Sequence, residues 1–283
     1  MRDTAPDESR RSSAAPAARP PRAGQTGGGA RPATGALPSP ELARAFSRRL
    51  RAWYRRHGRD LPWRHIRDPY QILVSELMLQ QTQVSRVLEF YDAFVARFPT
   101  LHAVARARPG QVREAWQGLG YYARAANLHR LARVVTCDGG DGRLPEDPAA
   151  LRRLPGIGAY TAGAVASFAY ERRAALVDTN VARVLARIFH PPLERRSPAA
   201  LRRLWQIAET ILPRRGDVAW THNQALIELG ATVCTARVRH CGICPAADWC
   251  ARLAADRAVT TPPAPPGRRR PRGRRPSPPR RGA

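Results

Sequence analysis

Lysine is absent from the whole sequence, so each of its 48 basic residues is an arginine. Without a lysine amine, no side chain of this sequence can form a Schiff base, which excludes lysine imine chemistry. Long apolar runs are absent as well, since no stretch of about 18 apolar residues is present to span a membrane. The charged N-terminal residues are not followed by an apolar segment, so we expect no secretory signal peptide.

Acidic side chains are few, with 22 against 48 basic ones, and the formal net charge is +26. An excess of this size indicates a polyanionic partner, for which nucleic acid is the simplest candidate. The five cysteines are expected to stay unpaired in a reducing compartment. We therefore expect a cytoplasmic protein that associates with the nucleoid and not with a membrane.

Composition divides the sequence into three parts. Residues 1–38 are mostly small residues, proline and arginine, and residues 256–283 are rich in proline and arginine. Neither part has enough large apolar residues to offset its ordering entropy, so both are predicted to be disordered. The C-terminal part is expected either to bind polyanions without sequence preference or to be a linker remnant. Between them, residues 39–255 carry apolar residues at helical spacing.

The apolar pattern of this central part predicts an all-α fold. Asp68 and Pro69 precede "YQILVSELML" and are typical of an N-cap and a first helical residue. A second helix is predicted at "TNVARVLARIFH", where apolar side chains recur on one stripe. The members of that stripe are Val181, Val184, Leu185 and Ile188. The alternation of apolar and polar residues that is typical of strands is not evident.

Two carboxylates stand at informative places in these helices. Glu76 lies on or near the apolar face of the first helix, where an unpaired carboxylate is costly to bury and usually stays protonated. It is either an edge residue that reaches water or a general acid with a raised pKa. Asp178 precedes the second helix, where a plain helix cap is the simpler interpretation and a functional carboxylate the alternative.

The segment "CTARVRHCGICPAADWC" contains four cysteines, which are Cys234, Cys241, Cys244 and Cys250. Four thiolates so close in sequence indicate a metal centre. Structural zinc sites usually contain two Cys-x2-Cys pairs and only one is present, so a four-iron cluster is favoured over zinc. The loop between the first two cysteines carries Arg237 and Arg239, which the centre would hold against phosphate. The fifth cysteine, Cys137, is predicted to be buried.

A glycine-rich turn lies in "LPGIGAYTAGA", which begins at Leu154. Gly156 and Gly158 allow backbone N–H groups to approach an anion, and the start of the following helix adds its positive dipole end. Such a turn would bind phosphate without sequence preference. Taken alone, an ordinary turn between helices is the simpler interpretation, but the basic charge and the cysteines favour phosphate binding.

Seven motifs in order resemble one family and cover about three quarters of the chain. They are the cysteine spacing together with "LPWR" at Leu61, "SELMLQQTQV" at Ser75, "GLGYYARAANLH" at Gly118, "LPGIGAYTAGA" at Leu154, "VDTNVARVLAR" at Val177 and "NQALIELGATVC" at Asn223. The chain resembles the helix-hairpin-helix, iron–sulfur DNA glycosylases related to endonuclease III, and most of all the MutY-type adenine DNA glycosylases. The resemblance implies two helical lobes with DNA in the cleft between them. A six-helix lobe is expected at 68–183 with its hairpin at 154–160, and a cluster lobe is expected at 39–67 plus 184–255.

The resemblance also implies roles for single residues. In such enzymes the Glu of "SELMLQQTQ" protonates adenine, which makes Glu76 the expected general acid. The Asp of "VDTNV" stabilises the sugar cation, which gives this role to Asp178. Tyr160 and Asn180 match positions that line the sugar and organise the carboxylates. Because bifunctional relatives carry a strand-cutting lysine at the Tyr160 position, the resemblance implies a monofunctional enzyme that leaves an abasic site.

Other positions match residues that contact DNA in the family. Those expected around the opposite 8-oxoguanine and the gap in the base stack are Gln81, Thr82, Leu119 and Tyr121. Those expected in the adenine pocket are Trp63, Arg64 and Gln224. An intercalating tyrosine can replace lost base stacking, whereas the alternative for Tyr121 is a core residue beside Tyr122.

The activity implied by the resemblance is base-excision repair by a monomer with a [4Fe–4S] cluster. Its substrate would be double-stranded DNA that contains adenine mispaired with 8-oxoguanine or guanine. Many such enzymes carry a further C-terminal domain, similar to Nudix hydrolases, that helps to read 8-oxoguanine. The arginine- and proline-rich tail stands in its place here, so selectivity for the opposite base is implied less firmly. The alternatives are thymine excision from T·G mispairs, against which "LMLQQTQV" after Glu76 argues, and a non-catalytic iron–sulfur DNA-binding protein.

Overall fold

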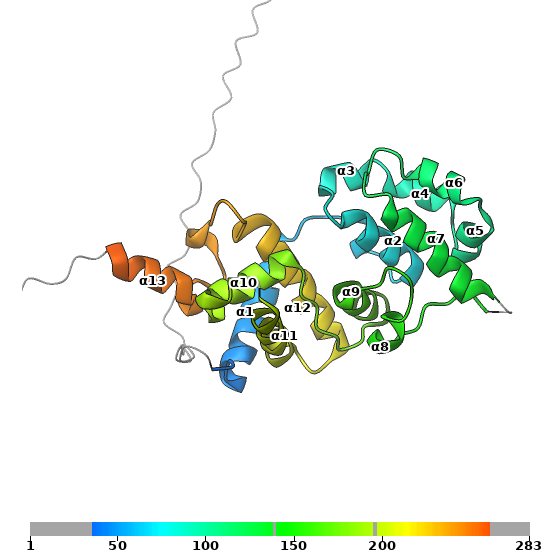
Figure 1. Cartoon of the computed structure of the whole chain (residues 1–283). Helices are drawn as coiled ribbons and strands as arrows, with labels where there is room; N and C mark the ends of the chain where they lie inside the picture. Colours follow the sequence, from blue (N-terminus) through cyan, green and yellow to red (C-terminus); the bar gives the residue numbers. More distant parts are fainter. Residues whose placement is uncertain (1–35, 138–139, 195–196, 261–283) are drawn as a thin grey trace, which may run out of the picture.

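The structure is a computed structural model that describes residues 36–137, 140–194 and 197–260 (Figure 1). Within these ranges all regular elements are helices, and the one β-feature is an isolated antiparallel bridge between Cys234 and Arg239. The all-α prediction is therefore confirmed. In the same ranges, no helix is both long and apolar enough to cross a membrane. Most of the predicted N-terminal arm and of the predicted tail lies outside the described residues.

One group of helices combines the start of the chain with its C-terminal half (Figure 1). It consists of α1 (Pro40–His57), α10 (Thr179–Phe189), α11 (Pro198–Ile211), α12 (Gly216–Glu228) and α13 (Ala251–Thr260). The shorter turns attached to it are η3 (Pro191–Glu194), the π-helical η4 (Leu229–Val233), η5 (Cys241–Ile243) and η6 (Ala247–Trp249). Phe46 of α1 is fully buried at the centre, with its ring 5.3 Å from that of Phe189 and 6.1 Å from that of Trp249.

A second group of helices lies on the other side of the molecule and is reached through η1 (Pro62–Arg64). Its members are α2 (Pro69–Leu79), α3 (Val84–Leu88), α4 (Tyr91–Arg97), α5 (Leu101–Arg106), α6 (Pro109–Ala115), α7 (Ala123–Thr136), α8 (Pro148–Leu151) and α9 (Ala159–Tyr170). The described part of residues 68–183 thus contains more, and shorter, helices than the six implied by the resemblance. Helix α2 packs against α9 and α4, and α7 packs along α5.

Side-chain caps start many of these helices. Ser39, Asp68, Thr100, Asp147 and Ser197 each accept a hydrogen bond from the backbone N–H three residues later. Such caps satisfy N–H groups that have no partner inside the helix. The predicted start of α2 at an Asp cap followed by proline is confirmed.

The chain turns back along α9 after that helix ends, and this return places Asp178. Gly163 of α9 lies so close to the returning segment that an added Cβ would stand 2.3 Å from the carbonyl oxygen of Ala175. Asn223 of α12 fixes the same segment by donating to the Ala174 carbonyl and to the Ser167 hydroxyl, both at 2.9 Å. The segment therefore delivers Asp178 beside the first turn of α9.

The structure corrects the predicted start of the tail and the predicted burial of Cys137. Helix α13 continues to Thr260, beyond the predicted start of the disordered tail at 256, because its alanine-rich sequence favours a helix and Arg239 pairs with Asp256 at 2.6 Å. Cys137 is exposed and not buried, since it follows the last turn of α7, where the chain leaves the helix for solvent.

Candidate active site and metal centre

Glu76 lies in the middle of α2 with only 5% of its surface exposed. The interpretation of an edge residue that reaches water is therefore wrong. Burial raises the pKa of its carboxyl group to about 7, and the negative charge of Asp178 acts in the same direction. A hydrogen bond from the Tyr160 hydroxyl and the positive charge of Arg64 oppose this rise. Near neutral pH, Glu76 is thus a carboxylic acid that can still donate a proton.

Asp178 caps helix α10, as the simpler interpretation predicted. Its Oδ1 accepts a hydrogen bond from the Val181 backbone N–H at 2.6 Å, and its Oδ2 accepts one from Asn180 Nδ2 at 3.1 Å. Burial raises the pKa of Asp178, whereas these hydrogen bonds and the charge of Arg183 favour the ionised form. The same hydrogen bonds hold the carboxylate close to Glu76. Asp178 therefore caps α10 and is also part of the candidate active site.

Tyr160 stands in the first turn of α9, two residues after Gly158. Burial, together with the charges of Glu76 and Asp178, raises its pKa far above the ordinary value, so the phenol stays protonated. Its hydroxyl is a hydrogen-bond partner of Glu76. Three residues from α2, α9 and the start of α10 are therefore brought together, as the sequence predicted for Glu76, Tyr160 and Asp178.

Asn180 links the carboxylate site to the cysteine-bearing segment. Besides donating to Asp178, it accepts a hydrogen bond from Arg183 Nη2 at 2.8 Å. Arg183 also donates to the carbonyl oxygens of Gly230, at 2.9 Å, and of Cys234, at 3.0 Å. A short chain of polar contacts therefore runs from Asp178 to the backbone of the first cysteine.

The predicted hairpin is formed by α8, the turn after it and α9. Gly156 has a φ of +78°, a conformation that favours glycine, and an added Cβ would stand 2.6 Å from Asn127 Cβ. Gly158 is the N-cap of α9 and is exposed, and an added Cβ there would meet open space. The first backbone N–H groups of α9 thus begin at an exposed glycine, as a phosphate site requires.

Gln81 and Tyr121 are exposed and both have a positive φ, at 57° and 47°. Tyr121 is 58% exposed, so the interpretation as a core residue is wrong. Leu119 is buried, and its carbonyl oxygen faces the Thr82 hydroxyl at 3.4 Å. The two loops that carry these four residues lie side by side.

Arg124, for which the sequence predicts no role, joins those two loops. Its Nη1 donates to the carbonyl oxygens of Met78 at 2.7 Å and Gln80 at 2.6 Å, and its Nη2 donates to that of Leu119 at 3.1 Å. Because these hydrogen bonds of the buried guanidinium go to carbonyl oxygens, Arg124 fixes the backbone on both sides. Its position in "YYARAAN" gave no sign of these long-range contacts.

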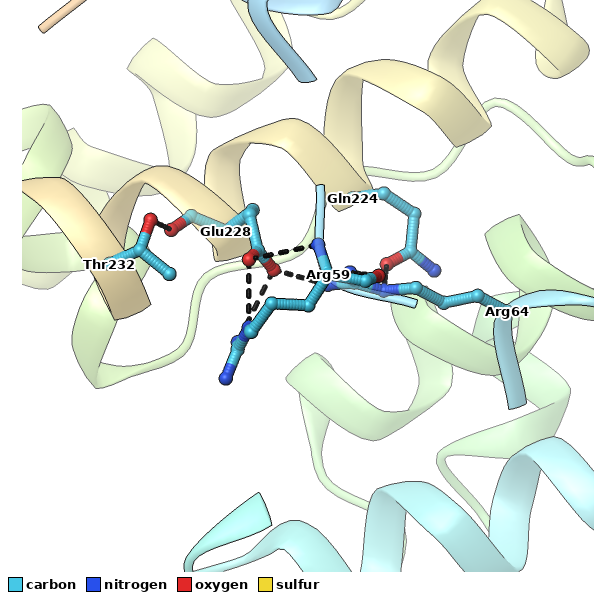
Figure 2. A network of polar contacts seen from close by, with 5 residues as sticks. All are labelled: Arg59, Arg64, Gln224, Glu228 and Thr232. Carbon is cyan, nitrogen blue, oxygen red and sulfur yellow. Dashed lines mark hydrogen bonds and ion pairs between the residues drawn. The ribbon is translucent and has the colours of Figure 1, made fainter. Parts of the chain in front are cut away.

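Two of the three residues predicted for the adenine pocket, Arg64 and Gln224, belong to one polar network, which is drawn in Figure 2. Trp63 is buried with its ring edge-on to Tyr91, at 5.4 Å between ring centroids. Arg64 is buried and donates from Nε to Gln224 Oε1 at 3.1 Å. Arg64 Nη2 also donates to Glu228 Oε2 at 2.6 Å, so η1 is tied to α12.

All four cysteines of the C-terminal segment line one hollow, to which Arg187 and Arg239 also contribute. None of them is in a disulfide. Burial raises the pKa of the Cys244 thiol to about 12, and the other three thiolates add to the effect by repulsion. Four thiol groups that line one hollow fit a metal centre, because its positive charge would favour their thiolate form. In the part of the chain that the structure describes, no three His, Cys, Asp or Glu side chains are arranged to hold a single metal ion.

The basic loop between the first two cysteines is exposed. Arg237 and Arg239 are both exposed, and Arg239 Nη1 pairs with Asp256 of α13 at 2.6 Å. Arg187 holds the base of this loop by donating to the carbonyl oxygen of Thr235 at 2.7 Å, and its Nη1 lies 3.5 Å from Cys234 Sγ.

Comparison with known proteins places this geometry in a family. A model of the HhH-GPD superfamily of base excision DNA repair proteins matches residues 74–209. A thymine-DNA glycosylase of Aeropyrum pernix is 36% identical over 208 residues, which are 73% of this chain and 93% of that protein. The chain belongs to the HhH-GPD superfamily.

Adenine DNA glycosylases are among the relatives of this HhH-GPD protein. The one from Mycobacterium tuberculosis (strain CDC 1551 / Oshkosh) is 49% identical over 203 residues, which are 71% of this chain and 66% of that protein. The chain therefore spans slightly less than two thirds of that relative's length. The solved structure of a thermostable thymine-DNA glycosylase superposes with a TM-score of 0.69 at 32% identity, covering 75% of this chain and 97% of that one.

The HhH-GPD match contains the three central residues Glu76, Tyr160 and Asp178, but it ends before the cysteines. Four residues that hold others in place carry no recognisable chemical signal in the sequence: Arg59, Arg124, Arg183 and Glu228. Arg124, Arg183 and Glu228 lie inside the motifs quoted above. That position is the one signal that could have identified them, since their chemistry is that of ordinary helical residues.

Proposed function

We propose that this HhH-GPD protein is an adenine DNA glycosylase that excises adenine mispaired with 8-oxoguanine or guanine. The observation that carries the proposal is the buried acid Glu76, with a pKa of about 7, beside the second carboxylate Asp178. Two carboxyl groups with different surroundings are what hydrolysis of a glycosidic bond requires. The similarity to adenine DNA glycosylases supports adenine as the base.

In the proposed reaction the adenine leaves the base stack, which costs a few kcal/mol and is cheapest at a mispair. Glu76 donates its proton to the base, because adenine is a poor leaving group as an anion. The ionised Asp178 faces the positive charge that develops on the sugar, and the protonated Tyr160 hydroxyl holds the carboxylates in place. Water then completes the hydrolysis and leaves an abasic site.

The proposed enzyme is monofunctional, because the sequence contains no lysine to attack the sugar. Tyr160 is a hairpin residue that hydrogen-bonds to Glu76, and its phenol carries no amine. Strand cleavage through a lysine imine is therefore not part of the proposed reaction.

We further propose that the two groups of helices form two lobes with DNA bound between them. The N–H groups behind Gly158 would bind phosphate, and the exposed basic loop of Arg237 and Arg239 would bind phosphate on the other lobe. Tyr121 would enter the gap in the base stack, with Gln81, Thr82 and Leu119 around the opposite base. A single chain supplies all these parts, so the proposed functional unit is a monomer.

The four cysteines are proposed to hold a [4Fe–4S] cluster. The support is the common hollow that all four cysteines line. When bound, such a cluster supplies a rigid cross-link of the segment through four iron–thiolate bonds. The chain's own arginines then keep the loop of Arg237 and Arg239 facing outward.

The test is incubation of the iron-loaded protein with duplexes that contain A·8-oxoG, A·G or T·G, followed by alkali. The proposal predicts cleavage at adenine in the first two duplexes and none in T·G. Cleavage of T·G alone would favour the thymine alternative. The similarity to a thymine-DNA glycosylase, of which the chain covers 93%, is the observation behind this alternative. Binding of all duplexes without any cleavage would favour a non-catalytic DNA-binding protein.

A further inference from the structure

Glu228 is a fully buried carboxylate at the C-terminal end of α12, and two arginines from the distant segment 59–64 reach it (Figure 2). Its Oε1 accepts hydrogen bonds from Arg59 Nε at 2.8 Å and from the Arg59 backbone N–H at 3.3 Å. Its Oε2 accepts from Arg59 Nη2 at 3.2 Å and from Arg64 Nη2 at 2.6 Å. Burial raises the pKa of Glu228, but these bonds and charges outweigh it, so the group stays ionised.

Arg64 is the member of this network that lies next to the proposed base pocket. Its three guanidinium nitrogens all donate: Nη2 to Glu228, Nη1 to the Arg59 carbonyl oxygen at 2.6 Å, and Nε to Gln224 Oε1 at 3.1 Å. The positive charge of Arg64 also acts on Glu76, which places the guanidinium within electrostatic reach of the proposed general acid. Arg64 therefore has one orientation, and Glu228 fixes it.

The contact with Arg64 decides which way the Gln224 amide points. An arginine nitrogen can only donate, so the amide atom that faces it must be the oxygen. The amide nitrogen of Gln224 is thereby turned away from Arg64, as Figure 2 shows. Gln224 is 5% exposed, and no hydrogen-bond partner of its amide nitrogen occurs among the described residues. Among the described residues this nitrogen is not one of the fully buried polar atoms that lack a partner, so the N–H2 group reaches solvent and can donate to a bound base.

We propose that Glu228 is a positioning residue for base selection: it fixes Arg64, which turns the Gln224 N–H2 group toward a ring nitrogen of the flipped base. The proposal rests on the proposed function as an adenine glycosylase. Each ring nitrogen N1, N3 and N7 of adenine accepts hydrogen bonds; at N1 guanine carries an N–H instead, so a donor facing N1 would also exclude guanine. A flipped base is read through such edges. Without Glu228, Arg64 loses the partner of Nη2, and Arg59, whose carbonyl oxygen holds Nη1, loses its own carboxylate partner. Arg64 is then held less tightly, so the Gln224 amide no longer has one fixed orientation.

The experiment uses iron-loaded full-length protein that carries Glu76→Gln, so that DNA is bound but not cleaved. Affinity is measured for duplexes in which the adenine opposite 8-oxoguanine is replaced by 1-deaza-, 3-deaza- or 7-deazaadenine. Each analogue exchanges one ring nitrogen for C–H and so removes one acceptor. We expect about 5- to 150-fold weaker binding for one of the three, because the Gln224 donor then stays unpaired. Adding Glu228→Gln should reduce this discrimination to less than about threefold.

The matched control is Glu209→Gln, which also removes a carboxylate that pairs with an arginine, Arg173 at 3.0 Å, but on an exposed part of α11. It should keep the discrimination. If the Glu228→Gln protein does not fold, Glu228→Asp is used instead. Aspartate keeps the buried charge paired but is one methylene too short to hold both arginines. The discrimination between adenine and the analogue should then fall by half or more. Unchanged discrimination in a folded Glu228 variant, or none in the Glu76→Gln parent, would overturn the proposal. Excision of adenine by the unmodified protein tests the proposed function separately.

Discussion

Replacing Glu76 by glutamine should make the protein more stable at alkaline pH while it abolishes excision. The glutamine side chain has nearly the same shape and can still bond to the Tyr160 hydroxyl, but it never ionises. The native carboxyl group is buried beside Asp178, and its pKa is raised from the ordinary value of 4.5 to about 7. Ionisation of Glu76 therefore costs more in the folded protein than in the unfolded chain.

The size and the sign of the effect follow from that difference in pKa. At about 1.4 kcal/mol per pH unit, a pKa of about 7 against 4.5 corresponds to about 3 kcal/mol. Between these two pH values the folded state binds more protons than the unfolded state, so the stability of the native protein falls as the pH rises. The loss begins near 4.5 and is complete above about 7. The Glu76→Gln variant does not lose stability in this way, because glutamine does not ionise.

The assay compares the melting temperatures of the iron-loaded native and Glu76→Gln proteins at pH 5 and pH 8.5. For a domain of this size about 1 kcal/mol shifts the melting temperature by about 2–4 °C, so the variant should melt about 6–12 °C higher at pH 8.5. At pH 5 the gap should be much smaller. Glu114→Gln, which breaks an exposed pair with Arg97, is the control and should show no such dependence on pH. An equal difference in melting temperature at both pH values, or a variant that melts lower than the native protein at pH 8.5, would refute the raised pKa of Glu76.

Three further changes have separate outcomes. Cys241→Ser should lower the iron content from about four per chain and remove the brown colour of the proposed cluster, and zinc at one per chain in the native protein would contradict the cluster. Asp178→Asn should reduce single-turnover excision by about 100-fold or more, because a charge opposite the sugar cation is lost, while asparagine still caps α10; a defect in melting temperature alone would leave only the cap. Tyr160→Lys should allow borohydride trapping of a covalent complex with DNA while the native protein gives little or none, and efficient trapping by the native protein would contradict a monofunctional reaction.

Local features of this protein could be predicted from its sequence because the contacts that create them are local. The Asp68 cap and Pro69 at the start of α2, and the Asp178 cap of α10, use side chains that bind backbone N–H groups three residues away. The apolar spacing around Glu76 indicated a carboxylate on a buried face. The choice between a water-reaching edge and a buried acid needed the helices that cover α2, since spacing alone does not show what lies opposite.

Long-range polar contacts could not be predicted in the same way. Glu228 in "IELGATVC" has the spacing of an ordinary helical glutamate, and it becomes a fully buried ion-pair partner only because η1 folds against α12. Arg124 likewise follows two tyrosines in a solvent-exposed turn, yet its guanidinium binds carbonyl oxygens from two loops about forty residues apart. Sequence patterns report the periodicity of one element, whereas these contacts depend on which elements meet.

The two carboxylates of the site differ in their hydrogen bonds, and this difference predicts the pH dependence of excision. Asp178 accepts hydrogen bonds from the Val181 backbone and the Asn180 side chain, which favour its charge, whereas burial dominates at Glu76. A proton shared by the pair therefore resides on Glu76. Above about pH 7 that proton is lost, so the single-turnover rate of excision should fall by about tenfold per pH unit. Asp178→Asn removes the neighbouring charge that helps to raise the Glu76 pKa, so its residual activity should begin to fall at a lower pH. A rate that stays flat from pH 7 to 9 in the native protein would show that Glu76 is not the proton donor.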